Sequence, residues 1–216
     1  MNKLWSFGDS FTFGEGVDRN QTFTNIIAKK IGFEDFNFGH AGFSNKMIFQ
    51  FLESSMYNIS KKDKVLVVMT TPHRDDIFDT LPDKIRLGGS SANLDKVYDF
   101  SNKFQIPRFI NILNKIENLL KGYDFKITMA FNPIFGYDYV GFEDKKSENF
   151  IEWGKPNNTL IDIVADNWCK ENQNNIFMNK SFFDKHNRQM KHLIKKGHPT
   201  IDGHKKIARK LIEYYD

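Results

Sequence analysis

The 216-residue chain has a single cysteine, Cys169, so it has no means of forming a disulfide bond within itself. A structural zinc site built on paired cysteines is excluded for the same reason. No apolar run approaches the length of about 18 residues that a membrane-spanning helix needs. The first residues, MNKLWSFGDS, also lack the apolar stretch of a signal peptide. These absences predict a soluble, cytoplasmic protein.

Apolar residues are plentiful instead: 40% of the chain is hydrophobic, and 22 residues are phenylalanine. Such a composition excludes global disorder, because a disordered chain lacks the residues that build a core. The length fits one domain over residues 1–216. Two segments, at about 77–106 and 134–157, match no regular pattern and are expected to be insertions over the sheet edge.

The net charge of +4 is too small to predict nucleic-acid binding, but it is unevenly distributed. Residues 185–210 contain nine Lys or Arg and one acidic residue, a net charge of +8, so the rest of the chain carries −4. This segment is either a solvated basic face or a source of positive potential that attracts anionic substrates. Nucleic acid is the least favoured partner, and the oligomeric state stays open.

Short apolar runs alternate with longer amphipathic segments. Helices are expected at residues 22–31, 44–56, 160–169 and 203–214, with another beginning after Pro107. Strands are expected at residues 4–7, 35–38, 65–69, 125–131 and 176–178. This alternation predicts right-handed crossovers and a parallel sheet covered by helices on both faces. The residues that do chemistry should then lie in loops at the carboxyl ends of the strands.

The first of these loops carries the strongest signal. In the segment FGDSFTFG, Ser10 directly follows the first predicted strand and stands between glycines. A serine on such a turn can expose its hydroxyl, while backbone N–H groups nearby hold a developing oxyanion. The plainer interpretation is a turn with a serine at the helix N-cap. We expect Asp9 to accept a hydrogen bond that fixes this loop.

Two further segments point to the same chemistry. The segment NFGHAGFSN at residues 37–45 follows the second strand and offers glycine N–H groups to the oxyanion. The segment GHPTIDGH at residues 197–204 precedes the last helix and carries His198. We expect His204, in the first turn of that helix, to be structural.

These segments, in this order and with the closing His-Pro-x-x-x-Gly-His run, resemble the SGNH (GDSL-type) hydrolase family. The resemblance is clear over residues 4–56 and 197–212. It implies Ser10 as the nucleophile, His198 as the general base, and the N–H groups of Ser10 and Gly42 as oxyanion donors. It also implies an α/β fold: a three-layer α/β/α, flavodoxin-like domain whose parallel five-stranded sheet has the order 2-1-3-4-5.

The sequence departs from the family pattern before the histidine. The family usually has aspartate three residues earlier, to orient the imidazole, but here that position is Lys195. A backbone carbonyl or Asp184 then orients His198, or the site is a Ser–His dyad, or catalysis has been lost.

The family's Gly-x-Asn-Asp block after the third strand is also missing, and residues 70–76 stand in its place. The asparagine of that block normally completes the oxyanion hole. Thr71, Arg74 or Asn45 takes over that function here, or two backbone donors suffice. Arg74 has a further interpretation, an ion pair with a neighbouring aspartate at the surface.

The sequence therefore predicts a serine hydrolase that cleaves ester bonds through an acyl-enzyme on Ser10. The substrate implied by the resemblance is a small-molecule or carbohydrate ester, with no cofactor and no metal. The alternative is a catalytically impaired module of the same fold that binds a carbohydrate or acyl ligand.

Overall fold

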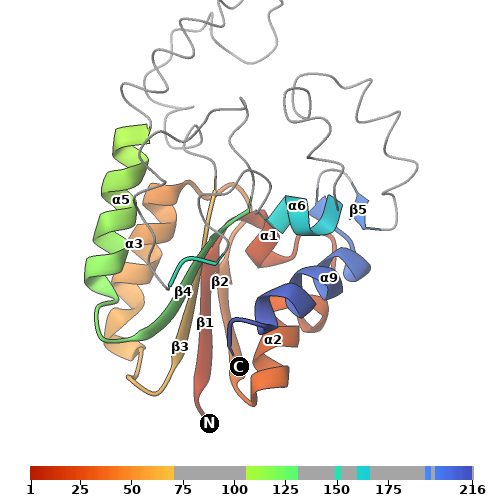
Figure 1. Cartoon of the computed structure of the whole chain (residues 1–216), viewed down its shortest axis with the longest axis horizontal. Helices are drawn as coiled ribbons and strands as arrows, with labels where there is room; N and C mark the ends of the chain where they lie inside the picture. The colour runs from red at the N-terminus through yellow and green to blue at the C-terminus, as the bar shows by residue number, and fades with distance from the viewer. Residues whose placement is uncertain (71–105, 131–148, 152–159, 166–192, 196–197, 216) are drawn as a thin grey trace, which may run out of the picture.

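The computed structural model describes residues 1–70, 106–130, 149–151, 160–165, 193–195 and 198–215 (Figure 1). Its centre is a parallel sheet of four strands in the order β2-β1-β3-β4. The strands are β1 (Lys3–Gly8), β2 (Glu34–Gly39), β3 (Lys64–Met69) and β4 (Asp124–Met129). The predicted parallel sheet and the order of its first four strands are confirmed. The fifth strand, predicted at residues 176–178, lies outside the described residues.

Helices cover both faces of the sheet, so the predicted three-layer α/β/α architecture is confirmed (Figure 1). One face carries α3 (Asn45–Ser55) and α5 (Ile106–Leu119). The other carries α2 (Phe23–Ile31), α6 (Leu160–Ala165) and α9 (Ile201–Ile212). A four-residue helix, α1 (Ser10–Phe13), lies over the carboxyl end of β1.

The central strands are apolar on both faces because each face meets a helical layer. On β1, Phe7 packs with the α3 and α5 layer, whereas Leu4 packs with the α2 and α9 layer. On β3, Val67 and Val68 divide in the same way. Alternate residues therefore build two separate cores, and the sheet between them is a rigid support for its loops.

Side-chain caps set where the helices begin. Thr22 accepts a hydrogen bond from Asn25 N at the start of α2. Thr200 accepts one from Gly203 N, and for this reason the last helix begins at Ile201, two residues before the predicted start. The predicted helix at residues 160–169 is described as far as 165.

One part of the expected insertion at 134–157 continues the sheet instead. Residues 149–151 lie parallel to β4, with Ile127 N donating to Asn149 O at 2.8 Å and Ile151 N donating to Ile127 O at 2.9 Å. Phe150 and Ile151 are buried there. The pairing places these residues along the edge of β4 that faces away from β3. The other residues of the two expected insertions, 77–105, 134–148 and 152–157, lie outside the described residues.

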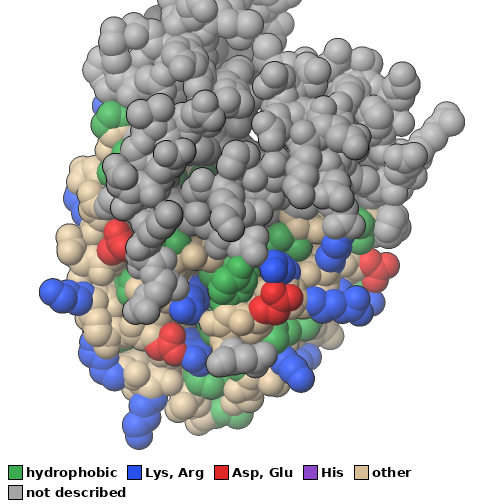
Figure 2. Space-filling view, viewed as in Figure 1, with side chains coloured by type: hydrophobic (Ala, Val, Ile, Leu, Met, Phe, Trp, Pro, Cys, Tyr) green, Lys and Arg blue, Asp and Glu red, His purple; other side chains and the backbone are tan. Residues whose placement is uncertain are grey.

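The described part of the basic segment lies mostly on α9, where several cations have partners nearby. Lys205 Nζ is 3.0 Å from Asp202 Oδ1, and Lys210 Nζ is 2.8 Å from Glu213 Oε2. On the face shown in Figure 2, Lys and Arg side chains stand among Asp and Glu rather than in one patch. These observations favour a solvated basic face.

Among the described helices, none combines the length and the apolar character needed to span a membrane.

Candidate active site

Ser10 is placed by the turn between β1 and α1. Asp9 caps the helix by accepting a hydrogen bond from Phe11 N at 3.0 Å, which confirms its predicted part in fixing the loop. Gly14 ends the helix in the left-handed conformation, and its N–H donates to Ser10 O at 3.0 Å. Ser10 is therefore the first residue of a tightly closed turn, and it is buried.

The end of β2 holds α1 from the side. Asn37 Nδ2 donates to Thr12 O and, at 3.0 Å, to Thr24 Oγ1, while Asn37 Oδ1 accepts from Gly39 N at 2.8 Å. At Gly39 the backbone of α1 comes so close that a Cβ atom there would lie 2.3 Å from Phe13 N. The amide and the glycine together fix the position of α1 over the sheet.

His198 is placed by a short hairpin in front of α9. The strands β5 (Ile194–Lys195) and β6 (His198–Pro199) pair antiparallel, with Lys195 opposite His198. Thr200 N donates to Leu193 O at 2.8 Å, which closes the hairpin at the start of the helix. Backbone pairing thus positions the residue that carries the imidazole.

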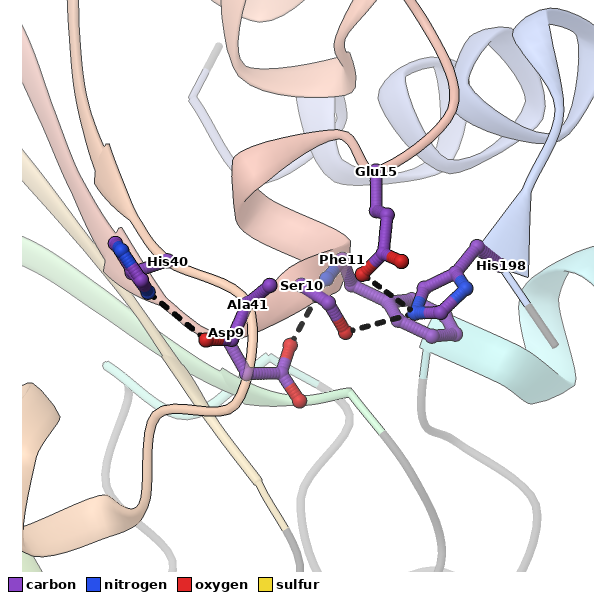
Figure 3. A network of polar contacts seen from close by, with 7 residues as sticks. All are labelled: Asp9, Ser10, Phe11, Glu15, His40, Ala41 and His198. Atoms are coloured by element: carbon purple, nitrogen blue, oxygen red, sulfur yellow. Dashed lines mark hydrogen bonds and ion pairs between the residues drawn. The ribbon is translucent and has the colours of Figure 1, made fainter.

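The structure brings the two predicted catalytic side chains together. His198 Nε2 lies 3.0 Å from Ser10 Oγ, a hydrogen-bonding distance, although the residues are 188 positions apart (Figure 3). The imidazole also packs against the ring of Phe11, with ring centroids 6.1 Å apart. A histidine nitrogen at this distance can take the hydroxyl proton and so activate the serine.

Glu15 is a third member of this group, and the sequence did not indicate it. Its Oε2 lies 3.3 Å from His198 Nε2, the same nitrogen that contacts Ser10 (Figure 3). The chain turns back at Gly14, and Glu15 N donates to Ser10 O at 3.1 Å. The sequence does contain a hint, since Glu15 stands between two glycines directly after the serine segment. The direction in which its side chain points, however, depends on that turn.

The other predicted site residues are only partly described. Gly42 lies in the loop between β2 and α3 with a φ of +83°. Asn45 binds the backbone at the end of β3: its Nδ2 donates to Thr70 O at 3.2 Å and its Oδ1 accepts from Thr70 N at 2.9 Å. These two bonds give Asn45 a structural function in joining α3 to β3.

Three predicted residues, Thr71, Arg74 and Asp184, lie outside the described residues. Within the ranges that the structure does describe, no three His, Cys, Asp or Glu side chains form a group that could hold a metal ion.

His204 is fully buried between α9 and the start of α2, in agreement with a structural function. Its Nδ1 accepts a hydrogen bond from Phe23 N at 3.2 Å, and its ring stacks on that of Phe23 with centroids 5.7 Å apart. Burial, with a smaller contribution from nearby His198, lowers the pKa of His204 from 6.5 to about 4. The imidazole is therefore neutral in the folded protein at neutral pH.

We predict that this burial makes the fold sensitive to acid. In the unfolded chain His204 titrates near 6.5, so between pH 6.5 and about 4 the unfolded state binds more protons and the free energy of unfolding falls as the pH falls. The contribution of His204 is complete above pH 6.5, and about 3 kcal/mol of it is lost once the pH falls below its folded pKa of about 4.

Urea unfolding of the wild type and of His204→Asn at about pH 7.5 and about pH 5 measures this effect. Asn keeps an acceptor for Phe23 N but does not titrate, so the variant should lose less stability between the two pH values. Equal losses in the two proteins would contradict the prediction.

No family model matches the sequence, and no curated protein matches it. Solved structures are similar to it over nearly its whole length. TesA has a TM-score of 0.52 at 11% identity, covering 100% of this chain and 98% of its own. A protein from Desulfitobacterium hafniense assigned to the lipolytic G-D-S-L family has a TM-score of 0.50 at 14% identity, with 99% of each chain covered. A lipolytic G-D-S-L family member from Veillonella parvula has a TM-score of 0.49 at 14% identity, with 99% and 97% covered.

At these identities the likeness concerns the fold. It agrees with the parallel sheet covered by helices on both faces. The chain has the fold of the lipolytic G-D-S-L proteins, which is the family its sequence resembles.

Proposed function

We propose that this protein hydrolyses carboxylic esters through an acyl-enzyme on Ser10. The observation that carries the proposal is the 3.0 Å contact between Ser10 Oγ and His198 Nε2. It joins a nucleophile and a base from the first and last loops of the fold. This arrangement is the one that serine hydrolysis requires.

The reaction then proceeds in two halves. Ser10 Oγ attacks the ester carbonyl carbon as its proton passes to His198 Nε2, and the carbonyl oxygen becomes an oxyanion. The C–O bond breaks, the proton passes from Nε2 to the leaving alcohol oxygen, and the acyl group stays on Ser10. Water then attacks the acyl carbon as its proton passes to His198 Nε2. The bond between that carbon and Ser10 Oγ breaks, Nε2 returns the proton to Oγ, and the acid is released.

Backbone N–H groups of Ser10 and Gly42 are the proposed oxyanion donors. The left-handed turn at Gly42 lies in the loop after β2, the strand next to β1, at the same edge of the sheet as Ser10. In other serine hydrolases a single oxyanion donor contributes about 3 kcal/mol to transition-state stabilisation.

We propose small-molecule or carbohydrate esters as substrates, since the fold is that of lipolytic proteins.

A fluorophosphonate probe, which modifies only activated serines, tests the proposal. We expect one label per chain, mapped by peptide mass spectrometry to the segment that contains Ser10. Ser10→Ala should not be labelled. A wild-type protein that is not labelled, and that also leaves p-nitrophenyl acetate intact, would indicate the alternative, a binding module that has lost its chemistry.

A further inference from the structure

Glu15 and Ser10 share one nitrogen of His198. Ser10 Oγ lies 3.0 Å and Glu15 Oε2 lies 3.3 Å from Nε2, and Figure 3 shows both groups directed at that atom. The position of Glu15 follows from the backbone, because Glu15 N is hydrogen-bonded to Ser10 O at 3.1 Å. Glu15 thus belongs to the same closed backbone turn as Ser10.

In the proposed reaction, Nε2 also gives its proton to the alcohol oxygen of the ester. That oxygen must come within about 3 Å of Nε2 for the transfer. The alcohol oxygen and Glu15 Oε2 are then neighbours of one nitrogen, and no more than roughly 6 Å separates them. A substituent one or two bonds further along the alcohol lies within the electrostatic reach of the carboxylate.

Glu15 forms no ion pair with a Lys or Arg in the part of the chain that the structure describes. His198 is its ion-pair partner there, and His198 must be neutral to accept the proton of Ser10. The Glu15 side chain is 47% exposed, so its carboxylate is accessible to a molecule in solution. Lys205 and Lys210 on α9 have carboxylate partners of their own.

We propose that Glu15 selects the alcohol portion of the substrate by charge, so that esters of cationic alcohols are favoured over neutral and anionic esters of the same shape. This inference rests on the proposed ester hydrolysis. A preference for cationic esters is the opposite of the attraction for anionic substrates that the basic segment at residues 185–210 suggested. The carboxylate is in contact with the base itself, whereas the described lysines at 205 and 210 are paired.

Three acetate esters of nearly equal shape test the selection. Acetylcholine is cationic, neohexyl acetate is its neutral carbon isostere, and acetyl isethionate is anionic. The alcohols differ in intrinsic leaving ability, so the informative quantity is the change in their kcat/KM ratios between the wild type and Glu15→Gln. We expect the preference for the cationic over the neutral ester to fall about tenfold in Glu15→Gln, and the discrimination against the anionic ester to weaken by a similar factor.

Glu53→Gln is the matched control. It removes the same charge from an exposed position near the far end of α3, and its ratios should equal those of the wild type. Unchanged ratios in Glu15→Gln would overturn the selection, even if all three rates fell together, because a uniform fall is the effect of misplacing His198. If the wild type hydrolysed none of these esters nor p-nitrophenyl acetate, the proposed hydrolysis would fail and the selection with it.

Discussion

Replacing Ser10 or His198 with Ala is expected to lower kcat/KM for p-nitrophenyl acetate by at least about a thousandfold, and replacing both should lower it little further. The reason is the 3.0 Å contact between Oγ and Nε2, which makes the two side chains one proton-transfer unit. Once either is gone the unit no longer works, so the second substitution removes nothing more. Steady-state kinetics of the two single variants and the double variant measure the effect.

His40→Ala is the matched control for removing an imidazole. His40 is exposed in the loop after β2, where its Nδ1 lies 2.8 Å from Ala41 O and its ring stacks on Phe43. Its loss should change kcat/KM by less than about threefold. Independent, multiplying losses in Ser10→Ala and His198→Ala would show that the two residues do not act together.

Gly39→Ala is expected to lower the free energy of unfolding by about 3 kcal/mol or more. A Cβ atom at position 39 would lie 2.3 Å from Phe13 N and 2.6 Å from the carbonyl carbon of Thr12. Both atoms belong to the backbone of α1, so the clash is relieved only by moving the helix that carries Ser10. We therefore expect activity to fall as well, even where the variant is still folded.

The control is Gly32→Ala, which separates steric conflict from glycine's backbone freedom. Gly32 has a φ of +74° and open space around its would-be Cβ, so Ala there should cost about 1 kcal/mol, the strain of the left-handed conformation. Urea unfolding of the two variants under the same conditions makes the comparison. If Gly39→Ala lowered the free energy of unfolding no more than Gly32→Ala does, the predicted steric conflict between residue 39 and α1 would be contradicted.

Much of the fold follows from local patterns in the sequence. The run at residues 65–69 is apolar at every position, which is typical of a short strand between two helical layers, and it forms β3. Thr22 and Ser44 precede amphipathic segments and cap α2 and α3. Residues 149–151 were not predicted beside β4, because a single bridge between distant segments leaves no periodic pattern.

The pair at the centre of the site was implied by the resemblance to the SGNH family, and the fold permits it because loops from distant parts of the chain meet at one edge of the sheet. Glu15 was not, since its carboxylate is directed by the left-handed turn at Gly14 and not by residue spacing. Asn45 is a second residue with a partner that the sequence did not predict. Its residue type suits an oxyanion donor, and its amide also binds both backbone groups of Thr70, a partner that only the packing of α3 on β3 reveals.

Trapping the acyl-enzyme is the most direct test of hydrolysis through Ser10. The protein is mixed with p-nitrophenyl acetate, quenched in acid during turnover, digested and analysed by mass spectrometry. We expect one added acetyl group on the peptide that contains Ser10, and none on that peptide in Ser10→Ala. If the wild type released p-nitrophenol while Ser10 stayed unacetylated, or if Ser10→Ala released it at the wild-type rate, the mechanism would be contradicted.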